Sequence, residues 1–121
     1  MSESAVLDPS VLDALRQLTP PGEPDVLHDV LRMFLQEVPA RMERLRNAMA
    51  AGNIEEVHRS AHSLKGSAGN IGAHALYSAF KALDEKSKSG NLDGAEALVE
   101  ELRIEFGRVE AAIHRLIGSG G

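Results

Sequence analysis

Residues 54–71 read IEEVHRSAHSLKGSAGNI, and this segment decides the fold of the chain. Its apolar residues recur at steps of three and four, which is the spacing of one face of an α-helix. These residues are Ile54, Val57, Ala61, Leu64, Ala68 and Ile71. Gly52 and Asn53 form a turn before the segment, and Gly72 ends it. The pattern therefore predicts a helix from about Ile54 to Asn70 that buries one face.

Two further helices are predicted after this segment, because helical apolar spacing resumes beyond each turn. One spans about His74 to Ser89, and the other spans about Asp93 to Ile117. The residues expected to point inward from these two helices are Leu76, Phe80, Leu83, Leu98, Leu102, Phe106, Val109, Ile113 and Leu116. Each helix thus has an apolar face to contribute to a shared core.

Two helices are also predicted before the segment. A long one starts at about Asp25, which suits an N-cap, and continues to Ala51, with Pro39 as a kink or a restart. Its apolar face holds Leu27, Val30, Leu31, Phe34, Leu35, Val38, Met42, Leu45 and Met49. A short helix opens at Pro9, and the proline-rich segment 19–24 separates it from the long one. The short helix carries Val11, Leu12, Leu15 and Leu18 on one side.

These elements predict an all-α protein, with an antiparallel four-helix bundle core and one or two additional short N-terminal helices. Short connections make sequential helices antiparallel neighbours. The sequence has neither an alternating strand pattern nor a repeat at solenoid spacing. We expect a single domain over residues 10–117, a disordered N-terminus over residues 1–9 and a flexible tail over residues 118–121.

The composition excludes several classes of protein. The chain has 121 residues and a net charge of −5, whereas a general nucleic-acid binder is normally basic. It has no cysteine, which excludes disulfides and thiolate chemistry. No apolar stretch approaches the roughly 18 residues that span a bilayer, and no signal peptide is apparent. We expect a cytoplasmic monomer, or a domain of a larger protein, with no nucleic-acid or membrane partner.

His62 lies on the polar side of the predicted helix, roughly 130° around it from the centre of the apolar stripe. A buried structural histidine would lie on the stripe. Lys65 follows one turn later, and Gly66 stands where a side chain would otherwise cover the imidazole. Glycine costs roughly 1 kcal/mol relative to alanine inside a helix, and Gly69 repeats that cost. The two glycines indicate close approach by a phosphoryl group, a partner surface, or both.

Phosphoryl chemistry fits this arrangement. Neutral imidazole is a good nucleophile near pH 7, because its unperturbed pKa is about 6.5. The ammonium group of Lys65 can reach the oxygens of a phosphoryl group held on His62. From geometry alone, an ordinary exposed histidine beside an exposed lysine remains the alternative.

The residues also carry a family resemblance. The run Ala61-His62-Ser63-Leu64-Lys65-Gly66, with Asn70 and Gly72-Ala73 downstream, resembles the signature of histidine-containing phosphotransfer (HPt) domains of multistep phosphorelays. The resemblance covers about residues 25–117 and implies a four-helix bundle with the reactive histidine exposed on its side. It also implies response-regulator receiver domains and a sensor kinase, hybrid kinases included, as partners.

The resemblance implies a role for each site residue. His62 would accept a phosphoryl group, most simply on Nε2, from an aspartyl phosphate on one receiver domain and pass it to another. Lys65 would steady the phosphate, and Gly66 would leave room for it and for the receiver. Asp84, 22 residues after His62, would orient the ring through Nδ1–H. Lys88 matches a position that is often basic.

Such a domain would not be a complete enzyme. The chain has no nucleotide loop of the G-x-x-x-x-G-K type and no carboxylate cluster that would hold Mg²⁺. By resemblance the receiver supplies the metal and most of the positioning, so no cofactor and no metal site are expected here. An ordinary solvated helix face with i,i+4 pairs is the alternative for Lys81, Asp84, Glu85 and Lys88.

Other functions compete with this interpretation. Glu55, His58 and His62 have metal-ligand spacing on one helix, but a di-iron site needs a second copy of Glu-x-x-His, which the chain lacks. A helical docking module could use Met33, Met42 and Met49 as an adaptable surface, although methionines at this spacing are more often core.

A general-base enzyme using His28, His74 or His114 lacks an evident nucleophile. The last alternative lies within the family. The chain could be the phospho-accepting domain of a hybrid or chemotaxis-type histidine kinase, and the sequence alone does not separate that from a free-standing protein.

Overall fold

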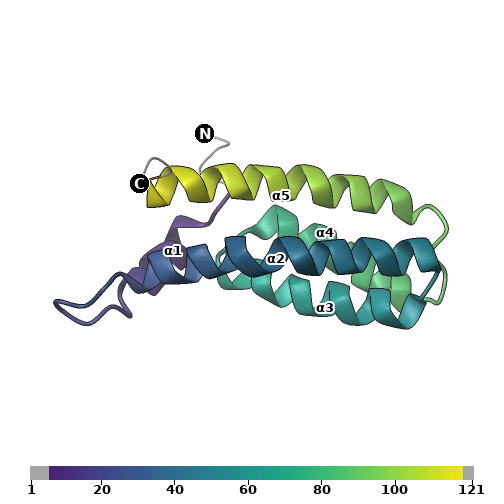
Figure 1. Cartoon of the computed structure of the whole chain (residues 1–121), viewed down its shortest axis with the longest axis horizontal. Coiled ribbons are helices and arrows are strands. Elements are labelled where there is room, and N and C mark those ends of the chain that lie inside the picture. Colours follow the sequence, from purple (N-terminus) through teal and green to yellow (C-terminus); the bar gives the residue numbers. More distant parts are fainter. Residues whose placement is uncertain (1–5, 119–121) are drawn as a thin grey trace.

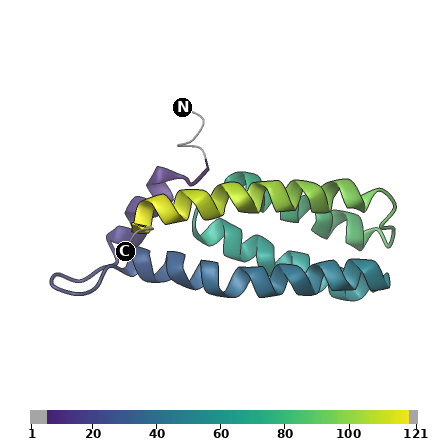
Figure 2. The same cartoon turned by 45° about the horizontal axis from the view of Figure 1, so that its top comes forward.

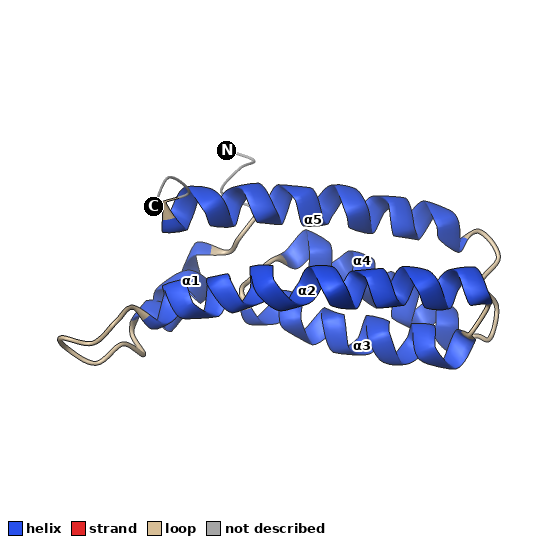
Figure 3. Ribbon diagram, in the orientation of Figure 1, coloured by secondary structure: helices blue, strands red, loops and turns tan. Residues whose placement is uncertain are grey.

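The computed structural model describes residues 6–118, which form five α-helices and no strand (Figures 1 and 3). The helices are α1 (Pro9–Arg16), α2 (Val26–Ala51), α3 (Ile54–Asn70), α4 (His74–Lys88) and α5 (Ala95–Ile117). The predicted all-α class is confirmed, and α3 has the bounds that its apolar spacing predicted.

Side-chain caps begin the first three helices where the sequence places short polar residues. Asp8, Asp25 and Asn53 accept hydrogen bonds from the backbone N–H groups of Ser10, Leu27 and Glu56, which would otherwise lack a partner. Asp25 is the N-cap that the sequence predicted. Left-handed Gly52, with φ 68°, ends α2 and turns the chain into α3.

The helices α2, α3, α4 and α5 lie along one another with alternating direction, and α1 lies at one end of this bundle (Figures 1 and 2). Helices that follow one another in the sequence pack together: α3 packs against both α2 and α4, and α4 packs against α5. Helix α2 also contacts α5, which closes the bundle. This is the antiparallel four-helix core, with one short N-terminal helix, that the sequence predicted.

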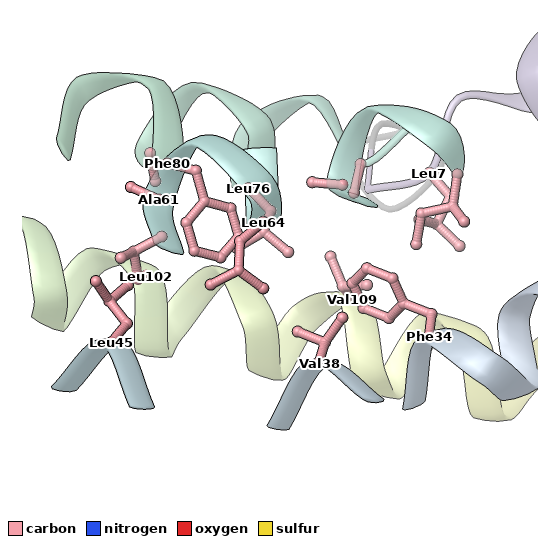
Figure 4. Packing of buried hydrophobic residues seen from close by; sticks show 14 of the residues in the cluster. Leu7, Phe34, Val38, Leu45, Ala61, Leu64, Leu76, Phe80, Leu102 and Val109 are labelled. Atoms are coloured by element: carbon pink, nitrogen blue, oxygen red, sulfur yellow. The ribbon is translucent and has the colours of Figure 1, made fainter. Parts of the chain in front are cut away.

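The core consists of aliphatic side chains from all five helices together with Phe34 and Phe80 (Figure 4). The contribution of α3 is Val57, Ala61, Leu64 and Ala68, all of which are buried. Figure 4 draws Ala61 of α3 and Phe80 of α4 within this core, and both side chains are fully buried. The apolar stripe of α3 therefore faces inward as predicted, and its opposite side is left for solvent.

Two residues that the sequence analysis placed on apolar helix faces are exposed instead. Leu18 lies two residues beyond the end of α1 at Arg16, so helical spacing no longer determines where its side chain lies. Leu116 lies off the buried face of α5, because that face continues by steps of four from Val109 through Ile113 to Ile117. Both predictions were wrong.

Pro39 does not restart α2, which runs unbroken from Val26 to Ala51. Proline removes one backbone N–H and normally breaks a helix. Here Val38 and Leu45 are buried on either side of the proline. Burial of this apolar face offsets the lost hydrogen bond and keeps the two halves in one helix.

The prediction of a disordered segment over residues 1–9 was wrong for the part that the structure describes. Leu7 is buried in the core, and the backbone N–H of Asp8 donates to the carbonyl of Gly72 at 2.9 Å. Residues 1–5 lie outside the described range. So do residues 119–121 of the predicted tail.

Candidate functional site

His62 lies in the middle of α3 on the side away from the core, and 65% of its side-chain surface is exposed. Its neighbours toward the core, Ala61 and Leu64, are buried. The solvent-facing position predicted from the apolar spacing is therefore the observed one. A histidine in this position can be reached by another protein without any change in the core.

A buried carboxylate lies against the His62 ring. Asp84 of α4 is 1% exposed, and its Oδ2 is 3.3 Å from Nδ1 of His62 and 3.2 Å from Nζ of Lys65. Phe80 and Leu83 of the same helix are buried in the core. The packing of α3 on α4 thus assembles the residues that the sequence proposed as a site.

The neighbours of Asp84 keep it ionised. Burial alone would raise the pKa of its carboxyl, but hydrogen bonds from Lys65 and His62, with the nearby His58, lower that pKa below its usual value. An ionised carboxylate only accepts hydrogen bonds. The Nδ1 of His62 that faces it must therefore be the protonated ring nitrogen.

This assignment fixes the chemistry of the ring. Neutral imidazole carries one N–H, so a proton on Nδ1 leaves Nε2 with a lone pair. Within residues 6–118 no side chain or backbone group pairs with Nε2 of His62. The site therefore presents a nucleophilic nitrogen on an exposed ring, with an ammonium group one helical turn away.

The glycines near His62 differ from each other. A Cβ added at Gly66 would meet no atom within 4 Å, so the space beside His62 is open on that side. A Cβ added at Gly69 would lie 3.4 Å from the Tyr77 ring of α4. This is an ordinary van der Waals distance, so the Tyr77 ring limits the size of a side chain at position 69 without requiring glycine there, whereas nothing within the described chain lies against position 66.

His58 is the site residue whose role the sequence analysis missed. Its Nε2 is 3.0 Å from Oδ1 of Asp84, although the two atoms are not aligned as a hydrogen bond. Its ring lies roughly parallel to that of His62, with the ring centroids 6.1 Å apart. The signal was present as the i,i+4 pair of histidines, which we considered only as metal ligands.

Arg41 of α2 was also missed. Its guanidinium donates to the hydroxyls of Ser63 and Ser67, both on α3, the first of them next to His62. It borders a cleft between the two helices, of about 180 Å³, that Arg44 and Arg59 also line. No periodicity in the sequence could indicate this contact, because it depends on the register of α2 against α3.

The remaining candidates do not join the site. Lys88 is the exposed last residue of α4 and makes no hydrogen bond or ion pair with the described site residues. Among residues 6–118, no group of three or more histidine or acidic side chains is arranged to hold a metal ion. His74 pairs with Asp8, and His28 lies near Asp25; within residues 6–118 neither histidine makes a hydrogen bond or ion pair with His62.

An all-α bundle with an exposed histidine held by a buried carboxylate is the arrangement expected of histidine-containing phosphotransfer domains. A family model described as "Hpt domain" matches residues 29–121, and the chain belongs to that family. The crystal structure of histidine-containing phosphotransfer protein B (HptB) from Pseudomonas aeruginosa PAO1 is similar over 91% of this chain and 92% of that one. The two have a TM-score of 0.83 and 30% sequence identity.

A plant protein is similar as well. Histidine-containing phosphotransfer protein 2 of Arabidopsis thaliana is 25% identical over 95 residues, which cover 76% of this chain. The chain spans 61% of the length of that relative.

None of the helices within residues 6–118 is both long and apolar enough to cross a bilayer.

Proposed function

We propose that this protein is a phosphoryl carrier of a phosphorelay, with Nε2 of His62 as the atom that is phosphorylated. The observation that carries the proposal is the exposed His62 ring whose Nδ1 faces the buried Asp84 carboxylate. This contact directs the proton to Nδ1 and leaves Nε2 as the nucleophile. Membership of the Hpt domain family supports the same chemistry.

The proposed step balances without an additional reactant. The Nε2 lone pair attacks the phosphorus of an aspartyl phosphate on a receiver domain. An N–P bond forms, the acyl O–P bond breaks, and the receiver's carboxylate leaves. The proton on Nδ1 stays in place, so the phosphorylated ring is positively charged and is stabilised by Asp84. The same step in reverse passes the phosphoryl group from His62 to the aspartate of a second receiver.

Two neighbours of His62 have distinct roles in this proposal. The Lys65 ammonium, 20% exposed and 3.2 Å from the Asp84 oxygen that faces His62, attracts the phosphoryl oxygens. Open space at Gly66 admits the phosphoryl group and the receiver surface around it. Both residues position charge and shape, which is most of what phosphoryl transfer requires of a protein.

The proposed partners of the carrier are proteins that would supply the metal ion and the phosphoryl group. The site offers no G-x-x-x-x-G-K nucleotide loop and no aligned metal ligands within the described residues, so the carrier would rely on receiver domains for the metal. A sensor histidine kinase, hybrid or separate, would supply the phosphoryl group. We also propose a monomer that works in the cytoplasm and is not itself an enzyme.

The test is transfer of labelled phosphate from phosphorylated receiver domains, with His62→Gln beside the wild type. We predict that the variant accepts no label and keeps its helical circular dichroism, because residue 62 is exposed and outside the core. His114→Gln, which alters an exposed histidine on α5, is the matched control and should accept label normally.

The stability of the label identifies the bond. Phosphohistidine is lost in acid and survives alkali, whereas an acyl phosphate is lost in alkali. Normal labelling of His62→Gln would show that another histidine is the phosphorylated residue. Absence of label on the wild type from every receiver and kinase of the source organism would favour a docking module.

A further inference from the structure

One oxygen of the buried carboxylate is left without a hydrogen bond. Oδ2 of Asp84 faces both Lys65 and His62, but Oδ1 makes no hydrogen bond in the described part of the chain. Leaving a buried carboxylate oxygen unpaired is costly, so a nearby donor is expected. The nearest is Nε2 of His58, which is 3.0 Å away, also buried, and also unpaired.

We propose that His58 is a positioning residue for phosphoryl transfer at His62, an inference that rests on the proposed function. A proton on Nε2 of His58 would be donated to Oδ1 after a small rotation of the ring. This bond would hold the carboxylate with Oδ2 turned toward His62 and Lys65. His58 would thus act through Asp84 and would not touch the phosphoryl group.

The spacing of the three donors supports this role. His58, His62 and Lys65 stand at positions i, i+4 and i+7 of α3, which places them in a row on one side of the helix. Asp84 lies opposite this row on α4 and meets all three. The carboxylate torsion is intrinsically broad, so donors on both oxygens are what fixes its orientation.

The two histidines would then hold their protons on different nitrogens. His62 faces Asp84 with Nδ1, whereas His58 faces it with Nε2. In this arrangement Nε2 would be free on the ring that is 65% exposed, and it would donate to Asp84 on the ring that is 38% exposed. This difference explains how two neighbouring histidines can share one carboxylate while only His62 offers Nε2 to a partner.

The test compares two variants of the full chain. His58→Leu removes the donor, whereas His58→Gln keeps an N–H donor at about the same distance from the backbone. Nitrogen-15 NMR of the unphosphorylated protein reads which ring nitrogen of His62 carries the proton. Phosphoramidate, whose P–N bond breaks as ammonia leaves, provides the rate of phosphorylation, and mass spectrometry locates the phosphate.

We expect His58→Leu to shift His62 from the Nδ1–H form toward the Nε2–H form and to slow phosphorylation roughly tenfold. This is the lower end of the loss seen when outer partners of metal-bound histidines are removed. His58→Gln should restore both. An unchanged His62 tautomer and rate in His58→Leu would overturn the proposal, as would equal impairment in both variants. Phosphate on a residue other than His62 would contradict the proposed function alone, because the tautomer is measured before phosphorylation.

Discussion

Gly66 is the residue at which helix stability and access to His62 have opposite requirements. It lies inside α3, where alanine would be more stable, and the space beyond its Cα is open. The chain therefore keeps a glycine that its own packing does not require. The proposed function supplies a reason for it, which is access for a phosphoryl group or a receiver domain.

We predict that Gly66→Ala raises the free energy of unfolding by up to about 1 kcal/mol while it slows phosphoryl transfer. Gly66→Leu should slow transfer by on the order of 10- to 100-fold, because a larger side chain displaces the reacting groups. Urea unfolding and transfer from a phosphorylated receiver measure the two effects. Gly107→Ala is the matched control, since Gly107 also lies inside a helix beside open space. If Gly66→Leu transfers at the wild-type rate, the role assigned to Gly66 is wrong.

At the scale of elements, the turn between α3 and α4 holds the N-terminal segment. Gly72 has φ 73°, and a Cβ there would lie 2.9 Å from Cβ and 3.0 Å from the backbone N of Asp8. The Asp8 N–H donates to the Gly72 carbonyl, and its side chain pairs with His74 at 2.8 Å. One turn therefore ends α3, begins α4 and docks the segment that leads into α1.

Replacement of this glycine tests the docking directly. We predict that Gly72→Ala lowers the free energy of unfolding by about 2–4 kcal/mol, from the left-handed backbone and from overpacking against Asp8. Gly90→Ala has the same left-handed backbone but open space, and should lose only about 1–2 kcal/mol. Chemical unfolding of both variants gives the difference. Equal losses would mean that the contact with Asp8 adds nothing.

The elements themselves could be predicted well from the sequence, since caps and apolar spacing are local. The bounds of α3 follow from Asn53 at one end and Gly72 at the other. The start of the last helix was placed at about Asp93 but lies at Ala95, because Gly94 with φ 79° precedes it. A single glycine at a helix start does not reveal its conformation in the sequence.

The site could be predicted only in part. The solvent-facing position of His62 and its spacing from Lys65 follow from one helix. The position of Asp84 beside them came from the family resemblance. The contacts of His58 with Asp84 and of Arg41 with the serines of α3 depend on the register between helices, which no spacing within one helix encodes.

At the scale of the whole molecule, acid is expected to weaken the fold through its paired carboxylates. The pKa of Asp8 is lowered from its usual 3.8 to about 2, chiefly by its hydrogen bond with His74 and then by those from Ser10. The pKa of Asp84 is lowered as well. Because both pKa values lie below those of the unfolded chain, both carboxylates stabilise the fold above about pH 3.8 and lose that contribution in acid. For Asp8 the loss is spread between about pH 3.8 and pH 2.

We predict that the urea midpoint of the wild type falls between pH 4 and pH 2.5 and that Asp8→Asn shows a smaller fall over the same range, measured by circular dichroism. At pH 4 the variant is already less stable than the wild type, because it lacks the Asp8 carboxylate. It therefore has no Asp8 contribution to lose as the pH falls. Asp93→Asn, at an exposed residue, is the control and should follow the wild type. Identical pH profiles for wild type and Asp8→Asn would remove the role given to Asp8.

The buried carboxylate beside His62 also bears on how long a phosphoryl group would stay. A phosphoryl group on Nε2 brings negative charge near Asp84, whose own charge is poorly screened because it is buried. The same carboxylate supports the positive ring and repels the phosphate that the ring carries. Lys65 offsets part of this repulsion, although its ammonium is already shared with Asp84. If His62 carries the phosphoryl group as proposed, we expect this repulsion to shorten the lifetime of the phosphorylated form, which suits transfer onward more than storage.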